Sequence, residues 1–125
     1  RVYITFPPRF SAFAGHQQMG RSLLRRLPYV QLWPERLLRS VGRLLTEHDY
    51  LIEEVLHNYR IGLSVHEFEK LCRRYGFVFL CQDLFLIRPI YRQRFGWSPK
   101  KIPSLPVVRE FLATGCECLL QKTAR

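Results

Sequence analysis

Acidic residues are missing from two long stretches of this 125-residue chain. Residues 1–34 contain five Arg and no Asp or Glu, and residues 88–101 contain five Lys or Arg and again no acid. The net charge of +10 comes from these two stretches, because the charges of the other residues cancel. Such stretches attract phosphate groups, nucleic acids or anionic membrane surfaces. A basic solvated surface without a partner is the simplest alternative.

Long hydrophobic runs are also lacking, and so is a secretory leader. The longest purely apolar runs extend over only a few residues, which is too short to cross a bilayer. No cationic start followed by an apolar stretch and a small-residue cleavage site is visible. Aromatic residues nevertheless make up 14% of the chain, which argues against disorder. We therefore expect one small folded domain with no transmembrane segment, and the order of the strands and helices predicted below places it in the α/β class.

The cysteines and histidines lack the spacing of a metal site. Cys116 and Cys118 form a C-x-C pair without a second paired cluster, and the four His are scattered. We expect Cys72 on the core face of a helix and Cys81 in a strand, both as buried free thiols. Free thiols suit a reducing compartment, so the expected location is the cytoplasm.

Strands are predicted by apolar runs that end at proline or glycine. The run 2–6 is continuous and β-branched before Pro7-Pro8, which is typical of a strand covered on both faces in a parallel sheet. Further strands are expected at 77–81, extended by or paired with 84–87, and at 117–121. Residues 88–105 are expected to form a loop, because prolines recur near the end of that stretch.

Amphipathic spacing predicts the helices. Apolar residues recur at helical intervals after Pro34 and again over 49–59. The clearest signal is the capping box formed by Ser64 and Glu67, with Gly76 positioned to end the helix that follows. Shorter helices are expected within 21–32, where Pro28 would end the helix, and within 107–113.

Several of these segments together resemble one enzyme family. The run Val-Tyr-Ile-Thr-Phe-Pro-Pro at 2–8, followed by Ala14-Gly-His-Gln, resembles the fifth strand and the Gly-Gly-His loop of class I S-adenosylmethionine-dependent methyltransferases, with one glycine changed. The stretch Leu-Ser-Val-His-Glu-Phe-Glu-Lys-Leu at 63–71, with Tyr-Gly-Phe-Val at 75–78, resembles the next helix and the sixth strand. Residues 111–120 resemble the closing turn and the seventh strand.

The resemblance implies the C-terminal part of a doubly wound, Rossmann-like methyltransferase sheet with a helical insert. Residues 1–125 would then be a single partial domain. Its strand-five-like segment would be 1–8, its loop and helical insert 9–62, and its remaining helix and strands 63–125. The glycine-rich cofactor loop of the family is absent from the sequence. The chain also starts at Arg1 within a strand-like run, so we expect a fragment whose remaining N-terminal half holds S-adenosylmethionine.

The resemblance also suggests where an acceptor would bind. Ligands of doubly wound sheets bind at the carboxyl ends of the parallel strands. Residues leaving those ends would bind an anionic acceptor, either a small molecule or a lipid-linked one. The candidate substrate-binding residues are Pro7, Pro8, Arg9, Gln17, Arg88 and Arg92. His16 is the candidate catalytic residue, as a general base or to orient the acceptor. Phe6 and Arg9 depart from the motif of enzymes that methylate nucleic-acid bases.

Two interpretations from other classes stay open at this point. One is a small basic nucleic-acid-binding module, in which Tyr91, Phe95 and Trp97 stack on bases among the neighbouring cations. The other is a non-catalytic assembly domain that buries its leucine-rich helices against a partner. Residues 21–60 fit either a lid over the substrate or such an interface. The sequence determines neither the acceptor nor the oligomeric state.

Overall fold

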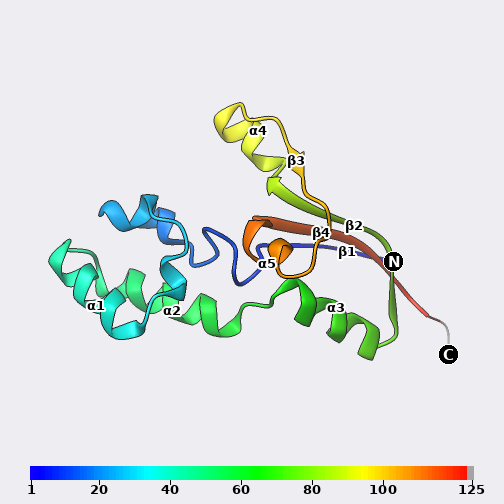
Figure 1. Ribbon diagram of the computed structural model, residues 1–125, viewed down its shortest axis with the longest axis horizontal. Helices are drawn as coiled ribbons and strands as arrows, with labels where there is room; N and C mark the ends of the chain where they lie inside the picture. The colour runs from blue at the N-terminus through cyan, green and yellow to red at the C-terminus, as the bar shows by residue number, and fades with distance from the viewer. Residues whose placement is uncertain (124–125) are drawn as a thin grey trace. The chain divides into compact units, whose positions relative to one another are not determined.

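A four-stranded sheet organises the residues near the two ends of the chain. The computed structural model describes residues 1–123, and its strands are β1 (Val2–Phe6), β2 (Phe77–Ile87), β3 (Lys100–Lys101) and β4 (Gly115–Lys122). Their order in the sheet is β1-β4-β2-β3, and each neighbouring pair is antiparallel (Figure 1). Because β1 and β2 both run antiparallel to β4 between them, they run parallel to each other. The α/β class predicted from the sequence is confirmed.

The prediction that β1 is covered on both faces is wrong for the part of the chain that the structure describes. Within residues 1–123, β1 pairs only with β4 and is therefore an edge strand of the sheet. Val2, Tyr3 and Thr5 are exposed, whereas Ile4 and Phe6 are partly buried. Among the described residues, this edge strand therefore has one packed face.

Two helices pack against the same face of this sheet. The longer is α3 (Val65–Arg74), which lies along the sheet in Figure 1, and the shorter is α5 (Val108–Leu112). The ring of Phe68 in α3 lies 4.7 Å from the ring of Phe6, and the same cluster includes Cys118 and Leu120 of β4. Side chains alternate along a strand. Thr5 and Glu117, which lie between these inward positions, therefore point to the opposite face.

The sequence signals at both ends of α3 are confirmed. The Ser64 hydroxyl accepts the backbone N–H of Glu67 at 3.1 Å, and the Glu67 carboxylate accepts the backbone N–H of Ser64 at 2.9 Å. Gly76 follows the helix with φ +71°, a left-handed conformation that residues with a Cβ rarely adopt. These local signals turn the chain from α3 directly into β2.

The segment 88–105 is not the expected loop. It contains α4 (Ile90–Phe95) and β3, which pairs back onto the end of β2. Gly96 ends α4 with φ +72° and reverses the chain toward β3. Figure 1 shows α4 standing away from the sheet, and the β2–β3 pairing closes the base of this projection.

Residues 12–62 form a second compact unit, and residues 1–11 together with 63–125 form the first. The second unit contains three short 3₁₀ segments and two α-helices. They are η1 (Gln17–Met19), η2 (Leu23–Arg26), η3 (Val30–Leu32), α1 (Glu35–Leu44) and α2 (Asp49–Ile61). Its core is formed by Leu24, Val30, Leu38, Ile52, Val55 and Leu56. The helices expected after Pro34 and over 49–59 are confirmed, and the helix expected within 21–32 is replaced by η2 and η3.

Cys72 is buried as predicted, but the prediction of a buried Cys81 is wrong. The register of β2 on β4 shifts between Phe79 and Cys81. The extra residue at this bulge turns Cys81 away from the helix-covered face. No helix among residues 1–123 has both the length and the apolar character needed to cross a bilayer.

Candidate functional site at the carboxyl ends of β1 and β2

The carboxyl ends of β1 and β2 lie at the same end of the sheet. β1 ends at Phe6 and β2 at Ile87, and β4 begins there at Gly115. Of the residues predicted to bind substrate, Pro7, Pro8 and Arg9 leave the end of β1, and Arg88 and Arg92 leave the end of β2. The structure therefore brings these five residues to one end of the sheet, where open α/β sheets bind their ligands.

Arg88 lies across this end of the sheet on the face opposite α3. Its Nη2 is 3.4 Å from the Thr5 hydroxyl, which points away from α3. The Arg88 side chain also passes directly over Gly115, where an added Cβ would lie 2.7 Å from Nε. Gly115 is thus required for this close approach. Within residues 1–123 the buried Nε has no hydrogen-bond partner.

Arg9 is held on the other face of the sheet. Its guanidinium lies 3.3 Å from the carboxylate of Glu67 in α3, and its backbone N–H donates to the Leu63 carbonyl at 2.8 Å. Pro8 is buried, and its carbonyl accepts the N–H of Ser11 at 3.0 Å. Pro7-Pro8 therefore shape the turn after β1, and Arg9 and Arg88 do not converge on one ligand position.

His16 and Gln17 belong to the second unit. His16 is exposed and adopts the left-handed conformation with φ 60°. Gln17 is fully buried, and its Nε2 donates to the carbonyls of Ala12 at 3.3 Å and Leu27 at 3.1 Å. These bonds tie Gln17 to its own loop, so a substrate would reach it only after that loop opened.

A polar cluster on the open face of the sheet was not predicted. Asp83 and Glu117 lie directly opposite each other in the β2–β4 register. The Tyr3 hydroxyl donates to Glu117 at 2.7 Å, and Lys101 lies 2.8 Å from Asp83. These partners offset the repulsion expected between two facing carboxylates. The alternation of inward Cys116, Cys118 and Leu120 around Glu117 was the signal in the sequence.

The same contacts change two pKa values. The hydrogen bond to Glu117 raises the pKa of the Tyr3 hydroxyl above its usual value, because it favours the protonated phenol. The hydrogen bond to Asp83 raises the pKa of the Lys101 ammonium. At neutral pH, Tyr3 therefore stays a hydrogen-bond donor and Lys101 stays a cation.

The neighbouring thiols do not have the properties of a nucleophile. Burial raises the pKa of Cys116 to about 11 and the pKa of Cys118 to about 12. A nucleophilic cysteine requires a lowered pKa, because the thiolate is the reactive form. No group of three or more His, Cys, Asp or Glu residues within 1–123 is arranged to hold a metal ion.

A pocket of about 170 Å³ lies between α3 and the sheet near the start of β1. It is lined by Val2, Ile4, Leu71, Cys72, Tyr75, Phe77 and Leu120. The surface that these residues present is entirely apolar. It offers nothing to the ribose hydroxyls or amino-acid group of S-adenosylmethionine, so this pocket does not fit that cofactor.

Comparisons of the chain with protein-family models, curated proteins and solved structures found no match.

Proposed function

We propose that this chain is the C-terminal, substrate-side segment of an S-adenosylmethionine-dependent methyltransferase that acts on an anionic acceptor. The observation that carries the proposal is the pairing of β1, β4 and β2. β1 and β2 run parallel, and the chain between them returns through α3, which packs on the sheet. This is a split strand–helix–strand crossover, in which the antiparallel β4 lies between the two parallel strands. It is compatible with one end of a doubly wound sheet, which is built from crossovers between parallel strands.

The uncovered face of the sheet and the open edge at β1 support the same proposal. Within residues 1–123, helices pack on one face, and β1 has no strand on its outer side. Doubly wound sheets carry helices on both faces and continue through further parallel strands. A remaining N-terminal half that adds strands beside β1 would cover the opposite face and supply the cofactor loop. The apolar pocket beside β1 would lie at that junction.

The acceptor would bind beside Arg88 and Arg92. Arg88 lies at the carboxyl end of the strands, where its buried Nε has no partner within residues 1–123, and Arg92 is exposed in α4. S-adenosylmethionine supplies the methyl group as a sulfonium, and its transfer is an in-line displacement that depends mainly on positioning. Arginine is well suited to orient an anionic acceptor, because it binds carboxylate or phosphate groups with two donors.

The cofactor-binding half provides the first test. We expect the coding sequence upstream of the Arg1 codon to encode, in frame, a strand, a glycine-rich loop and an acidic residue about 20 positions later. The protein that includes this segment should bind S-adenosylmethionine in a calorimetric titration. An upstream start codon, an unrelated upstream domain or the absence of binding would contradict the proposal.

The acceptor site is tested in that longer protein once its acceptor has been found. Arg88→Gln and Arg92→Gln should raise KM for the acceptor about tenfold each, as expected for the loss of a charge-assisted hydrogen bond. Arg36→Gln in α1 is the matched control, because Arg36 is an exposed arginine of the second unit. Equal KM values for all three variants would contradict an acceptor site at this end of the sheet.

A further inference from the structure

The projection between β2 and β3, residues 88–101, has a defined structure. We call it the 88–101 arm. Its base is closed by the pairing of Ile87 with Lys100, and its tip is formed by α4 and the left-handed Gly96. An added Cβ at Gly96 would meet no atom within 4 Å, so the chain reverses there in open space. Figure 1 shows the arm extending beyond the strands of its own unit.

Three aromatic rings of the arm pack against one another. The ring of Tyr91 lies 5.7 Å from Phe95 and 6.3 Å from Trp97, both in edge-on geometry, and Phe95 lies 5.2 Å from Trp97. Despite these contacts, Phe95 is 58% exposed and Trp97 is 55% exposed. Ile90 at the start of α4 is also exposed. The tip is thus a compact apolar knob that its own unit does not cover.

The arm that carries this knob is also rich in cations. The arm contains five Lys or Arg and no acid. Lys101 is paired with Asp83, and Arg88 contacts Thr5. The other three, Arg92, Arg94 and Lys100, are exposed and form no ion pair within residues 1–123. The arm therefore presents exposed apolar rings and unneutralised positive charge at the same place.

We propose that the 88–101 arm binds the surface of anionic lipid bilayers. The exposed rings enter at the depth of the headgroups, where Trp and Tyr are favoured, and the unpaired cations contact the lipid phosphates. Each cation near such a surface strengthens binding about fivefold, and this effect falls as salt is added. This inference does not depend on the methyltransferase proposal.

The ring geometry favours a bilayer over a single-stranded nucleic acid. Nucleic-acid-binding surfaces present separate aromatic faces on which successive bases stack. Here Tyr91 is in edge-on contact with both Phe95 and Trp97, so the three rings form one cluster and not a row of separate faces. The exposed Ile90 adds an aliphatic contact that a base cannot stack upon. Such a cluster suits insertion between lipid headgroups.

Vesicle binding tests the proposal on the full chain. Vesicles of phosphatidylcholine containing about 30% phosphatidylglycerol are titrated into the Trp33→Phe variant, in which Trp97 is the only tryptophan. We expect a blue shift of its fluorescence and cosedimentation of the protein, both absent with pure phosphatidylcholine. Binding should weaken steeply as the salt concentration rises. Absence of binding to anionic vesicles would overturn the proposal.

Matched variants separate the arm from the overall charge. The triple variant Arg92→Gln, Arg94→Gln, Lys100→Gln should bind at least tenfold more weakly than the parent. A second triple variant, in which Arg25, Arg36 and Arg43 become Gln, loses the same charge from exposed positions of the second unit and should bind nearly as well as the parent. Equal loss in both triple variants would show attraction to net charge alone and overturn the proposal.

Two further comparisons complete the test. Phe95→Ser should weaken vesicle binding, whereas Leu44→Ser, at an exposed leucine of α1, should not. Thermal melts monitored by circular dichroism check that each variant is folded. Arm-dependent binding of a labelled single-stranded oligonucleotide without any binding to anionic vesicles would assign the arm to nucleic acid and reject the bilayer.

Discussion

At the residue scale, Glu47 of the second unit is a carboxylate held by three backbone N–H groups. It is buried, and its oxygens accept the backbone N–H groups of Arg21 at 3.2 Å, Ser22 at 2.8 Å and His48 at 3.1 Å. Burial by itself would raise the pKa of Glu47, but the hydrogen bonds from Ser22, Arg21 and His48 outweigh burial and lower the pKa to about 2. Glu47 thereby fixes the 21–22 loop against the start of α2.

Replacing Glu47 should make the free energy of unfolding depend less on pH in the acidic range. The pKa of Glu47 is lower in the folded state than in the unfolded state, so its contribution is present above about pH 4.5 and is lost as the pH falls toward 2. Glu47→Gln should lower the free energy of unfolding by about 2 kcal/mol at pH 7 and by less at pH 3. Urea denaturation at both pH values measures this. An equal loss at pH 7 and pH 3 would contradict it.

Single residues also show the limit of prediction from sequence. Arg9 and Arg88 both follow strands, and the sequence correctly places them near strand ends. It does not specify the face of the sheet, because that depends on which neighbours each arginine meets. Arg9 pairs with Glu67 in α3, whereas Arg88 passes over Gly115 toward Thr5. Contacts between residues so far apart in sequence leave no local pattern.

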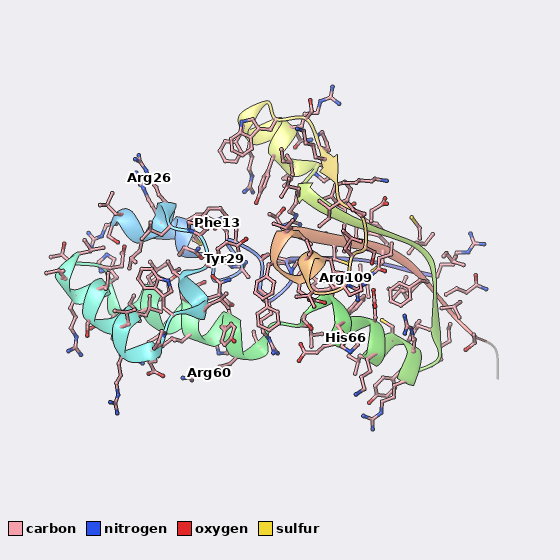
Figure 2. The ribbon with its side chains drawn as sticks, in the orientation of Figure 1. Phe13, Arg26, Tyr29, Arg60, His66 and Arg109 are labelled. Carbon is pink, nitrogen blue, oxygen red and sulfur yellow. The ribbon has the colours of Figure 1, made fainter. Side chains whose placement is uncertain are left out.

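At the element scale, α3 is held at its first turn by a residue of another helix. The carboxylate of Glu110 in α5 accepts the backbone N–H groups of Val65 at 2.8 Å and His66 at 2.9 Å. These are among the N–H groups that a helix cannot satisfy within itself. Beside it, Arg109 reaches from α5 to α3 and pairs with Glu69 at 2.8 and 2.9 Å (Figure 2). Adjacent residues of opposite charge thus join the two helices.

Glu110→Gln should loosen this junction. The amide can accept only through its oxygen, and its NH₂ group would face a backbone donor. The free energy of unfolding in urea should fall by about 2 kcal/mol, because two charge-assisted hydrogen bonds are weakened or lost. Glu67→Gln is the matched control. Gln can also complete a capping box, so we expect a loss below about 1 kcal/mol there. A larger loss for Glu67→Gln would count against this role of Glu110.

Elements differ in how much of them the sequence predicts. α3 carries its own start and stop signals, Ser64 with Glu67 and then Gly76, and was predicted closely. α4 was missed because it is only six residues long and too short for a hydrophobic period to show. The position of β1 at the edge of the sheet was missed, because strand order is decided by pairing with β4, which lies more than 100 residues away in the sequence.

At the scale of the whole molecule, the two units have separate cores. Leu38 and Ile52 belong to the core of residues 12–62, whereas Phe68 and Leu120 belong to the core beneath the sheet. The sequence predicted a helical insert at 9–62, and the second unit comprises 12–62. A substitution in one core therefore removes packing from that unit and leaves the packing of the other core in place.

Truncating one core should destabilise its own unit first. Leu38→Ala removes a fully buried side chain and should lower the local opening free energy of α2 amides by about 3 kcal/mol. The amides of β4 should keep their protection within about 0.5 kcal/mol. Native-state hydrogen exchange measures both sets in one experiment. Equal loss of protection in α2 and β4 would show that the molecule opens as a single cooperative unit.

The bulge in β2 has a consequence for how this gene tolerates small deletions. Before the bulge the odd-numbered Phe77 and Phe79 face the helices, and after it the even-numbered Gln82 and Leu84 do so. Loss of the Leu80 codon would remove the extra residue and leave every other side chain of the strand on its present face. Loss of the Cys81 codon would have the same result, because Leu80 would then take the outward position opposite Leu119. Loss of a single codon from 82 to 85 would instead exchange the faces of part of the strand. Neighbouring codons of one strand are therefore unequal, and Leu80 and Cys81 are the positions at which β2 can lose one residue without exchanging its two faces.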